Sequence, residues 1–512
     1  MKASQRVFIN TIVQYGRTVI NMVLSLYTVR LVLLTLGSSD YGIYTLVAGV
    51  VSMLAFITNS LVSTTQRYVS FYQGKGNLGK LKEVFNNSLI IHIVIGVAVV
   101  IILEVITPLL FNGFLNIPLE RVYAAKIVYQ TVVWLILFSF IAAPYRALLI
   151  SHENIVYISI IDVLDGILKV ALVIALTHIS YDKLVWYGMI MLGVQIFNFL
   201  AFSIYCYKEY EECIFPSIRR INTEYLRGMF SFAGWSLYST GCIVGRQQGV
   251  AIVLNKVAGP VINAAYGIGF QVAGYTNFLS ASLVNAISPQ IMKAEGSGDR
   301  DRALWLSNVT SKFIFFLLSA VCVPCMFEIN EILSWWLKDV PENANLFCIM
   351  VMAALLCDSL SIGLMYVNQA IGKIGLYTVV LTTPKLITLP LAWILLKSGM
   401  SLTIVAGVYV GIELLCAIMR VPFIKRTAGL KVGRFFKEVT LLEVLPFMVC
   451  LVTSYFCSRL FSFDYGFVLT FIVTFICYGA SIYLLGLTKT ERNIIFGILH
   501  GITNKFGNHD KD

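Results

Sequence analysis

Three cationic side chains lie inside long apolar segments of the sequence: Arg17, Arg246 and Lys385. None has an acidic residue beside it in the sequence, and ionisable groups at such depth normally face a protein interior or a wet cavity. The guanidinium of arginine binds phosphate oxygens through two parallel hydrogen bonds and keeps its charge. We therefore predict that these three side chains form a cationic substrate-binding site for an anion.

Polar side chains share a helical face with the first of these cations. At 100° per residue, Asn10, Gln14, Asn21 and Thr28 fall on the same face as Arg17. Hydrogen bonding between neighbouring helices is an alternative explanation for such a stripe. We interpret the stripe as the lining of a polar cavity. The same lining is predicted to include Gln248, Gln271, Tyr275 and Asn285.

A second group of charged residues in apolar segments is a candidate for ion coupling. Its members are Asp162, Asp165, Lys169, Asp358 and Glu413. Asp165 and Lys169 stand at i and i+4, a spacing that allows an ion pair within one helix. A self-neutralised structural cluster is therefore the alternative to a cation-coupling site around these residues.

The composition requires that most of these segments lie in a membrane. Hydrophobic residues make up 58% and charged residues 13% of the 512 positions, whereas soluble proteins carry about 25% charged residues. A membrane-spanning helix needs about 20 mostly apolar residues, and about fourteen such stretches follow one another here. The sequence therefore predicts an all-α polytopic membrane protein. The predicted spans lie near 9–34, 42–63, 87–111, 123–149, 156–178, 184–207, 229–254, 264–287, 305–329, 346–370, 375–396, 402–424, 442–461 and 466–487.

The positions of the 38 Lys and Arg residues predict the orientation of the chain. Most of them fall in loops on the side of both termini, which places both termini in the cytoplasm by the positive-inside rule. A repeat relates the two halves, because Tyr41-Gly42-Ile43 returns as Tyr266-Gly267-Ile268, and it predicts two pseudo-symmetric six-helix lobes. The predicted domains are an N-terminal lobe at 1–210, a cytoplasmic linker at 211–228, a C-terminal lobe at 229–437, and a final helix pair with a cytoplasmic tail at 438–512.

The sequence lacks the residue patterns of an enzyme or of a cofactor site. It contains no Walker A motif for ATP, no His, Cys, Asp and Glu cluster with metal-ligand spacing, and no Ser/His/Asp arrangement. We predict that the protein is not an enzyme and that it binds neither a cofactor nor a metal. The net charge of +11 reflects the orientation of the loops, so that no nucleic-acid partner is expected.

Several motifs resemble those of bacterial polysaccharide-biosynthesis flippases. They are the stretch from Tyr27 to Tyr44, Thr65-Gln66-Arg67-Tyr68, the stretch from Gly259 to Ile268, and Ser288-Pro289-Gln290. Over essentially its whole length the chain is similar to Wzx-type O-antigen and capsular polysaccharide flippases. These belong to the multidrug/oligosaccharidyl-lipid/polysaccharide exporter (MOP) superfamily. The resemblance implies a MATE-like fold of two six-helix lobes plus a C-terminal helix pair, and transport by alternating access.

The resemblance also implies a cargo and a location. The cargo would be an undecaprenyl-diphosphate-linked oligosaccharide repeat unit, flipped from the cytoplasmic to the outer leaflet of the bacterial inner membrane. The flipped repeat unit would be used in the synthesis of lipopolysaccharide O-antigen, capsule or exopolysaccharide. Membrane lipids and other polysaccharide-assembly membrane proteins would be the partners. A lipid II flippase and a multidrug or cation antiporter of the same superfamily are the alternatives. A membrane glycosyltransferase or polymerase is disfavoured, because the outer loops at 112–122 and 330–345 are too short to hold acceptor and catalytic groups.

Overall fold

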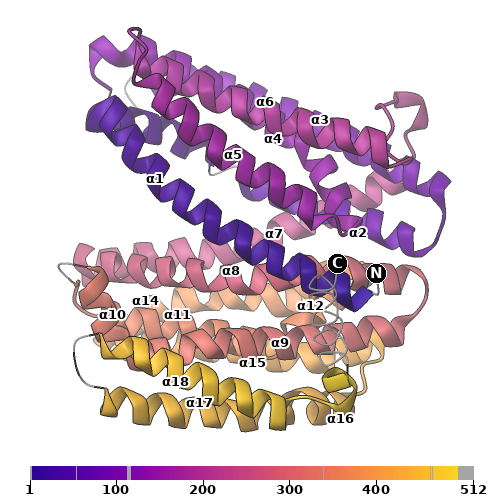
Figure 1. Ribbon diagram of the computed structural model, residues 1–512, viewed down its shortest axis with the longest axis vertical. Helices are drawn as coiled ribbons and strands as arrows, with labels where there is room; N and C mark the ends of the chain where they lie inside the picture. Colours follow the sequence, from indigo (N-terminus) through magenta and orange to yellow (C-terminus); the bar gives the residue numbers. More distant parts are fainter. Residues whose placement is uncertain are drawn as a thin grey trace, which may run out of the picture. The chain divides into compact units, whose positions relative to one another are not determined.

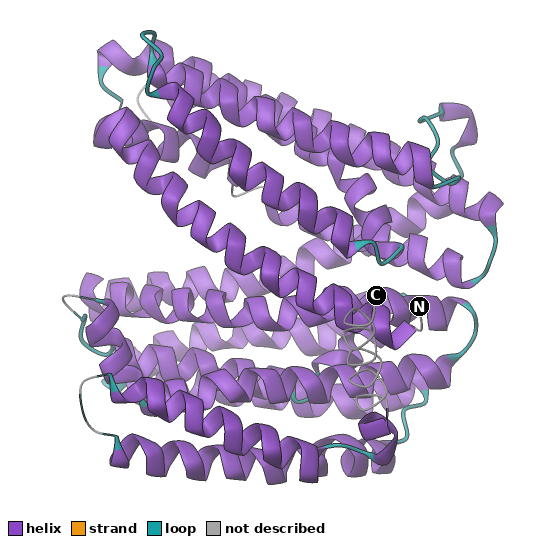
Figure 2. Ribbon diagram, viewed as in Figure 1, coloured by secondary structure: helices purple, strands orange, loops and turns teal. Residues whose placement is uncertain are grey.

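The computed structural model describes the chain except for residues 1–2, 53–54, 112–116, 338–339, 462, 464 and 494–512. Within the described residues the protein is helical and contains no strand (Figure 2). The all-α prediction is therefore confirmed. The predicted cytoplasmic tail falls largely in 494–512, outside the described residues.

The chain forms two compact units. One consists of Ile9–Leu237, and the other of Met1–Phe8 together with Tyr238–Asp512. The division falls inside helix α7 (Thr223–Ala258), which begins within the range predicted as a linker. Below, the two units are called the N unit and the C unit.

The N unit contains the first six helices and the start of α7 (Figure 1). Helix α4 lies at its centre and packs against α2, α3 and α6. Gly37 interrupts α1 with φ 78° and ψ 168°, a conformation that glycine adopts without steric cost. Two helices therefore meet at Gly37 within α1, between the predicted spans 9–34 and 42–63. The helices are α1 (Ala3–Ser52), α2 (Ala55–Gly74), α3 (Leu78–Leu109), α4 (Val122–Ser151), α5 (Ile155–Leu176) and α6 (Lys183–Glu209).

The C unit contains the rest of α7 and the helices that follow it. Two of its spans are irregular: α11 and α12 meet at a bend of 52°, and π-helical and 3₁₀ turns separate α13 from α14. The elements are α8 (Pro260–Gly296), α9 (Arg300–Phe327), α10 (Ile329–Trp336), α11 (Ala344–Ser359), α12 (Ile362–Ile371), α13 (Ile374–Tyr377), the π-helical η4 (Thr378–Thr382), the 3₁₀ turn η5 (Thr383–Ile387), α14 (Thr388–Lys397), α15 (Leu402–Ala428), α16 (Val432–Phe435), the π-helical η6 (Phe436–Thr440), α17 (Leu441–Leu460), α18 (Gly466–Ser481) and η7 (Ile482–Gly486).

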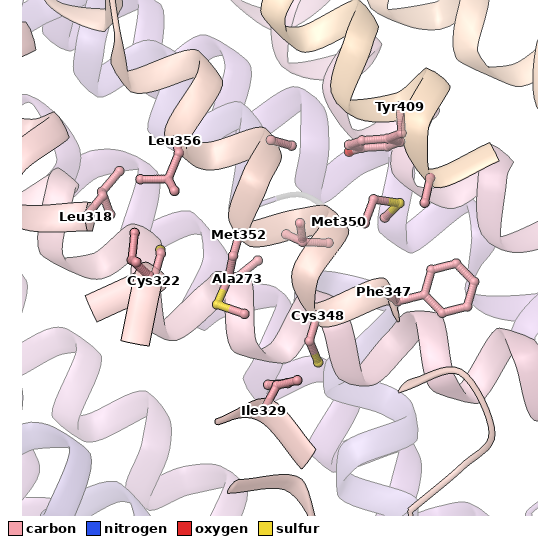
Figure 3. Packing of buried hydrophobic residues seen from close by; sticks show 14 of the residues in the cluster. Ala273, Leu318, Cys322, Ile329, Phe347, Cys348, Met350, Met352, Leu356 and Tyr409 are labelled. Atoms are coloured by element: carbon pink, nitrogen blue, oxygen red, sulfur yellow. The ribbon is translucent and has the colours of Figure 1, made fainter. Parts of the chain in front are cut away.

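Buried side chains of α8, α9, α11 and α15 form the main core of the C unit (Figure 3). Flexible Met350 and Met352 fill the space between bulkier groups there. The start of α12 packs so closely on α9 that a Cβ at Gly363 would lie 2.0 Å from the carbonyl oxygen of Ser307. The Gly363 N–H donates to Ser311 Oγ at 3.0 Å. This contact fixes the bent span against α9.

Helix length and hydropathy identify a multi-pass membrane protein. Eight helices among the described residues are long and apolar enough to cross a membrane, and the bent pair α11–α12 makes a ninth such span. All fourteen predicted ranges overlap helices. Helix α5 is not among the eight, since its 22 residues include Asp162, Asp165 and Lys169. Candidate site residues therefore lie both on α5 and on helices that are among the eight, such as α15 with Glu413.

Candidate functional site

The C unit holds a buried cluster of five charged residues, here called the Glu413 cluster: Arg246, Asp358, Lys385, Glu413 and Arg420. Glu413 accepts hydrogen bonds from Arg246 Nη1 at 3.0 Å and from Lys385 Nζ at 2.7 Å. Asp358 Oδ1 accepts from Arg420 Nη2 at 2.6 Å and lies 3.7 Å from Lys385 Nζ. The side chains of Arg246, Lys385 and Glu413 are each less than 10% exposed.

The irregular turns before α14 bring Lys385 into this cluster. Pro384 lacks an N–H and begins a 3₁₀ turn just after a π-helical turn. Thr388 Oγ1 donates to the carbonyl oxygen of Lys385 at 2.8 Å, and Thr383 Oγ1 donates to that of Thr378 at 3.1 Å. Both carbonyl oxygens also accept backbone N–H groups of the irregular turns, so that the threonine hydroxyls add a second hydrogen bond to each. Pro384 therefore lies where the span departs from a regular α-helix.

An aromatic ring completes the surroundings of Arg246. Its guanidinium carbon lies 4.2 Å from the ring centroid of Tyr409, one helix turn before Glu413 on α15. A cation over a ring face gains electrostatic attraction that grows when water is excluded. Tyr409 and Glu413 together therefore hold the guanidinium in one position.

The N unit holds a smaller cluster, here called the Asp162 cluster: Arg17, Arg146 and Asp162. Arg17 Nη1 donates to Asp162 Oδ2 at 2.6 Å. Arg146 donates to both carboxylate oxygens of Asp162, at 3.1 and 2.8 Å. One carboxylate on α5 thus binds cations from both α1 and α4.

The predicted pair on α5 is also present. Lys169 Nζ lies 2.7 Å from Asp165 Oδ2, and Asn198 Nδ2 of α6 donates to Asp165 Oδ1 at 2.7 Å. Asp165 and Lys169 neutralise each other, as expected for a self-neutralised structural cluster, the alternative to a cation-coupling site. Asp162 stands apart from them, because its partners are arginines of other helices.

Arg17, Arg246 and Lys385 all have acidic partners, although none of them has an acidic residue beside it in the sequence. Each binds a carboxylate of another helix, which neighbours in the sequence cannot reveal. Burying a lone charge costs several kcal/mol, so that a cation in an apolar span is normally paired. One positive charge nevertheless remains in excess in each cluster. The Glu413 cluster has three cations and two carboxylates, and the Asp162 cluster has two cations and one carboxylate.

The predicted cavity-lining residues occupy different environments. Asn10 is buried and donates from Nδ2 to the carbonyl oxygen of Glu153 at 2.8 Å, while Thr28 bonds to its own helix at Leu24. Gln14 Oε1 and Asn21 Oδ1 are buried and have no hydrogen-bond partner among the described residues. In the C unit, Gln248, Gln271 and Tyr275 are exposed and Asn285 is half-buried. A wet lining stays a prediction for all eight.

Arg146 and Arg420 belong to the two clusters but are not among the site residues predicted from the sequence. Arg146 follows Pro144 near the end of α4 and looks like an ordinary basic loop residue. Arg420 stands seven residues after Glu413 on α15, and two turns of helix place such residues on one face. That spacing is the only signal in the sequence that links Arg420 to the site.

An open cavity of about 780 Å³ lies at one end of the N unit. Tyrosines 68, 72 and 225 line it together with polar side chains and the start of α7. A Cβ at Gly228 would lie 2.7 Å from Tyr68 Oη, so the small residue lets the tyrosine pack against α7. The Arg67 guanidinium stacks over Tyr68 at 4.7 Å and over Phe232 at 5.0 Å. The full lining is Tyr68, Tyr72, Thr223, Glu224, Tyr225, Arg227, Gly228 and Ser231.

A hydrogen-bonded pair outside the spans, His152 and Glu212, closes the loop after α6. His152 Nε2 lies 2.5 Å from Glu212 Oε1, and the His152 ring stacks on Tyr210 at 3.9 Å. Burial raises the pKa of Glu212, but its hydrogen bond and charge interaction with His152 outweigh that effect and hold the pKa below the ordinary value. The pair thus ties the α4–α5 turn to the loop that precedes α7.

No metal-binding cluster of His, Cys, Asp and Glu occurs among the residues that the structure describes. The oxygens of Asp162, Asp358 and Glu413 are already engaged by cationic side chains. These carboxylates therefore act first as partners of Arg and Lys. Their assignment to ion coupling stays a prediction.

Solved transporter structures share the fold of this chain. A MATE transporter in its bent conformation is 14% identical, with a TM-score of 0.72 over 86% of this chain and 99% of the other. An outward-facing multidrug resistance MATE transporter of the MOP superfamily is 15% identical, with a TM-score of 0.70 over 85% and 96%. A MOP superfamily transporter from Pyrococcus furiosus is 15% identical, with a TM-score of 0.69 over 85% of this chain and 96% of the other. The reverse polarity of its binding pocket has suggested a different function for that transporter.

These likenesses define the fold. The protein has the MATE-like fold of the MOP superfamily, as predicted. No protein-family model and no curated protein matches the sequence.

Proposed function

We propose that the protein is a flippase for lipid-linked oligosaccharides. It moves an undecaprenyl-diphosphate-linked repeat unit from the cytoplasmic to the outer leaflet of the bacterial inner membrane by alternating access. The observation that carries this proposal is the single positive charge in excess in each cluster, of which the Glu413 cluster is buried and the Asp162 cluster half-buried. A cation substrate would instead call for clusters with an excess of carboxylates.

The chemistry of the two clusters suits a diphosphate. Arg246 and Arg17 each present a guanidinium fork, which matches phosphate oxygens in a bidentate manner. In the absence of cargo, Glu413 and Asp162 keep these cations paired, which avoids a buried lone charge. An incoming diphosphate competes with the carboxylates for the same donors. Binding is therefore an exchange of anionic partners, and it is readily reversed.

The sugar portion of the cargo suits the tyrosine-lined cavity of the N unit. Pockets for small molecules combine aromatic walls with a few polar groups that fix orientation. Tyr68, Tyr72 and Tyr225 offer ring faces on which the C–H faces of sugars stack, while Glu224 and Arg227 can hydrogen-bond sugar hydroxyls. The prenyl chain remains in the lipid, so that only the headgroup needs a polar route.

The membrane potential favours this direction of transport. Moving two negative charges outward across a field of 100 mV, inside negative, releases about 5 kcal/mol if they cross the whole field. No nucleotide is then needed as an energy source. Collapsing the potential in loaded vesicles is expected to slow flipping.

A multidrug or cation antiporter is the second candidate function. The shared fold supports it equally, since a multidrug resistance transporter is among the structural neighbours. The charge balance of the clusters favours the anionic cargo, and the transporter described with reverse pocket polarity is a precedent for a different function in this fold. A lipid II flippase differs from the proposal only in the headgroup.

Reconstituted vesicles can separate these functions. We expect the wild-type protein to flip a fluorescent prenyl-diphosphate oligosaccharide and not to move a cationic dye. Arg246→Gln removes the excess charge of the Glu413 cluster and one charge-assisted hydrogen bond, worth about 1.5–3 kcal/mol, which corresponds to a loss of about ten- to 150-fold. Lys397→Gln, at the exposed end of α14, is the matched control and should flip normally.

The opposite result identifies the rival. Dye movement that persists in Arg246→Gln, with no flipping by the wild type, would assign the protein to the cation antiporters. In the native host, deletion of the gene is expected to accumulate one defined prenyl-diphosphate oligosaccharide on the cytoplasmic side. The identity of that lipid also separates a repeat-unit flippase from a lipid II flippase.

A further inference from the structure

Helices α9, α17 and α18 pack against one another in the C unit (Figure 1), and a seam of buried polar side chains runs between them. It contains two carboxylic acids and several hydroxyl groups within an otherwise apolar interface. None of its members belongs to the Glu413 cluster. The seam consists of Ser319 and Glu328 on or next to α9, Glu443 and Ser454 on α17, and Thr470, Thr474 and Tyr478 on α18, all of them buried.

Glu443 is the most unusual group of the seam. Its side chain is 1% exposed, and neither carboxylate oxygen has a hydrogen-bond partner among the described residues. An ionised carboxylate that is neither paired nor hydrogen-bonded is among the costliest groups to bury, whereas a protonated carboxyl is neutral. Burial without a partner among the described residues therefore favours the protonated form of Glu443.

The nearest cation is engaged elsewhere. Lys312 of α9 is 1% exposed, and its Nζ donates to Glu491 Oε2 at 2.6 Å and to the carbonyl oxygen of Glu438 at 3.1 Å. Glu491 also accepts from Thr488 N at 2.8 Å, in a capping box with that residue. Lys312 and Glu491 thus neutralise each other, and no charge is left over for Glu443.

The other titratable groups around Glu443 are weak acids. Tyr478 of α18 interacts electrostatically with both Glu443 and Cys450, which lies two turns beyond Glu443 on α17. Cys450 Sγ itself donates to the carbonyl oxygen of Ser319 at 3.7 Å. Glu438 turns its side chain to Arg434 on the exposed side of the segment. Among the described residues, Lys312 is therefore the one cation that can stabilise an ionised Glu443, and it would have to leave Glu491 to do so.

Hydroxyl groups continue the seam away from Glu443. Tyr478 Oη and Ser319 Oγ are buried and interact with each other, although neither makes a hydrogen bond of good geometry among the described residues. Beyond them, Ser454 Oγ lies 3.4 Å from Thr474 Oγ1, and Thr470 Oγ1 donates to Glu328 Oε1 at 2.7 Å. The eleven residues from Glu443 to Ser454 correspond to about 16 Å along the helix. The seam thus covers about half of the hydrocarbon thickness of a membrane.

We propose that Glu443 is a proton-binding site and that the hydroxyl seam connects it to Glu328. A hydroxyl donates and accepts at the same time, so that a chain of such groups suits the passage of a proton. When Glu443 releases its proton, Lys312 moves from Glu491 to the new carboxylate. The proton therefore controls whether the segment after η7 is held on α9.

The use of this proton in transport rests on the proposed function, but proton binding itself does not. The first test is therefore spectroscopic and needs no substrate. Purified wild-type protein in lipid is expected to show the infrared carbonyl band of a protonated carboxyl group, which disappears as the pH rises. Glu443→Gln should lose this band. Glu438→Gln is the matched control, because it makes the same change in an exposed side chain of the preceding segment, and it should keep the band.

Persistence of the titrating band in Glu443→Gln, or its absence from the wild type, would overturn the proposal. Tyr478→Phe provides a second variant that keeps the ring and its packing in case Glu443→Gln does not fold. It should keep the band at a shifted frequency, because the neighbouring hydroxyl is lost. An unchanged frequency would remove Tyr478 from the seam and break the path to Glu328.

Proton coupling is tested separately in vesicles. If the proposed function also holds, flipping by the wild type should respond to a pH gradient, and flipping by Glu443→Gln should not. Glu443→Gln could lose the infrared band while flipping is independent of the pH gradient in both the wild type and the variant. Glu443 would then be a proton site that transport does not use, and only the coupling of the proton to transport would be overturned. A protein that moves only cationic dyes but shows the band would overturn the flippase and keep the proton site.

Discussion

Replacing Glu413 by Gln is expected to destabilise the protein and at the same time to strengthen its binding of anions. Glu413 is the shared partner of Arg246 and Lys385, with contacts of 3.0 and 2.7 Å between side chains that are less than 10% exposed. Removing one partner of a buried ion pair costs about 3–5 kcal/mol. We expect a loss at the lower end of this range, because Lys385 retains Asp358 at 3.7 Å.

The same substitution raises the excess charge of the Glu413 cluster from one to two. Pyrophosphate, the charged part of the proposed cargo, should then restore part of the lost stability. A ligand at 100 times its dissociation constant stabilises a folded protein by about 2.7 kcal/mol. The gain in melting temperature on adding pyrophosphate should therefore be larger for Glu413→Gln than for the wild type, as followed by thermal unfolding of the purified protein in detergent.

Glu342→Gln makes the same chemical change in the exposed loop before α11, and it should alter stability by less than about 0.5 kcal/mol. An unchanged melting temperature in Glu413→Gln would show that this carboxylate does not hold the two cations. An equal or absent response to pyrophosphate in the variant and the wild type would refute the Glu413 cluster as an anion site.

Three further perturbations test other parts of the structure. Gly363→Ala should lower the unfolding free energy by at least about 1–3 kcal/mol, because the new Cβ would lie 2.0 Å from a backbone oxygen of α9, and a normal melting temperature would contradict this close contact. Lys385→Gln should reduce flipping less than Arg246→Gln does, since an ammonium lacks the bidentate fork, and an equal loss in the vesicle assay would contradict that difference. The pair of His152 and Glu212 should stabilise the loop after α6 at pH values above the ordinary pKa of Glu, about 4.3. This stabilisation should disappear as the pH falls through the pKa of Glu212 in the folded protein, which lies below the ordinary value. In His152→Gln, the rate of proteolysis of the loop should no longer depend on pH in this range.

The fold could be predicted from the sequence because hydropathy alone determines where the helices lie. All fourteen predicted ranges overlap helices, and the MATE-like fold is confirmed by its structural neighbours. The ion pair of Asp165 and Lys169 was also predictable, since its partners stand at i and i+4 of one helix. Local spacing is sufficient for features of this kind.

The partners within the clusters could not be predicted in the same way. Asp162 is 145 residues from Arg17 in the sequence, and Glu413 is 167 residues from Arg246. Such contacts depend on how helices pack, which a single sequence does not encode at any fixed spacing. A cation in an apolar span therefore predicts that a buried acid exists, but not which acid it is.

The N unit and the C unit pair the cations of their charged clusters in the same way. The first long helix of each supplies an arginine, Arg17 on α1 and Arg246 on α7, and a carboxylate of a later helix binds it together with a second cation. A neutral pair would offer little to an anion, and an unpaired arginine would be costly to bury. In the proposed flippase, one cation in excess per unit would keep each cluster stable without cargo and still attractive to phosphate. Alternating access would require a site that releases what it binds, and a carboxylate that competes for the same arginine would provide the means of release.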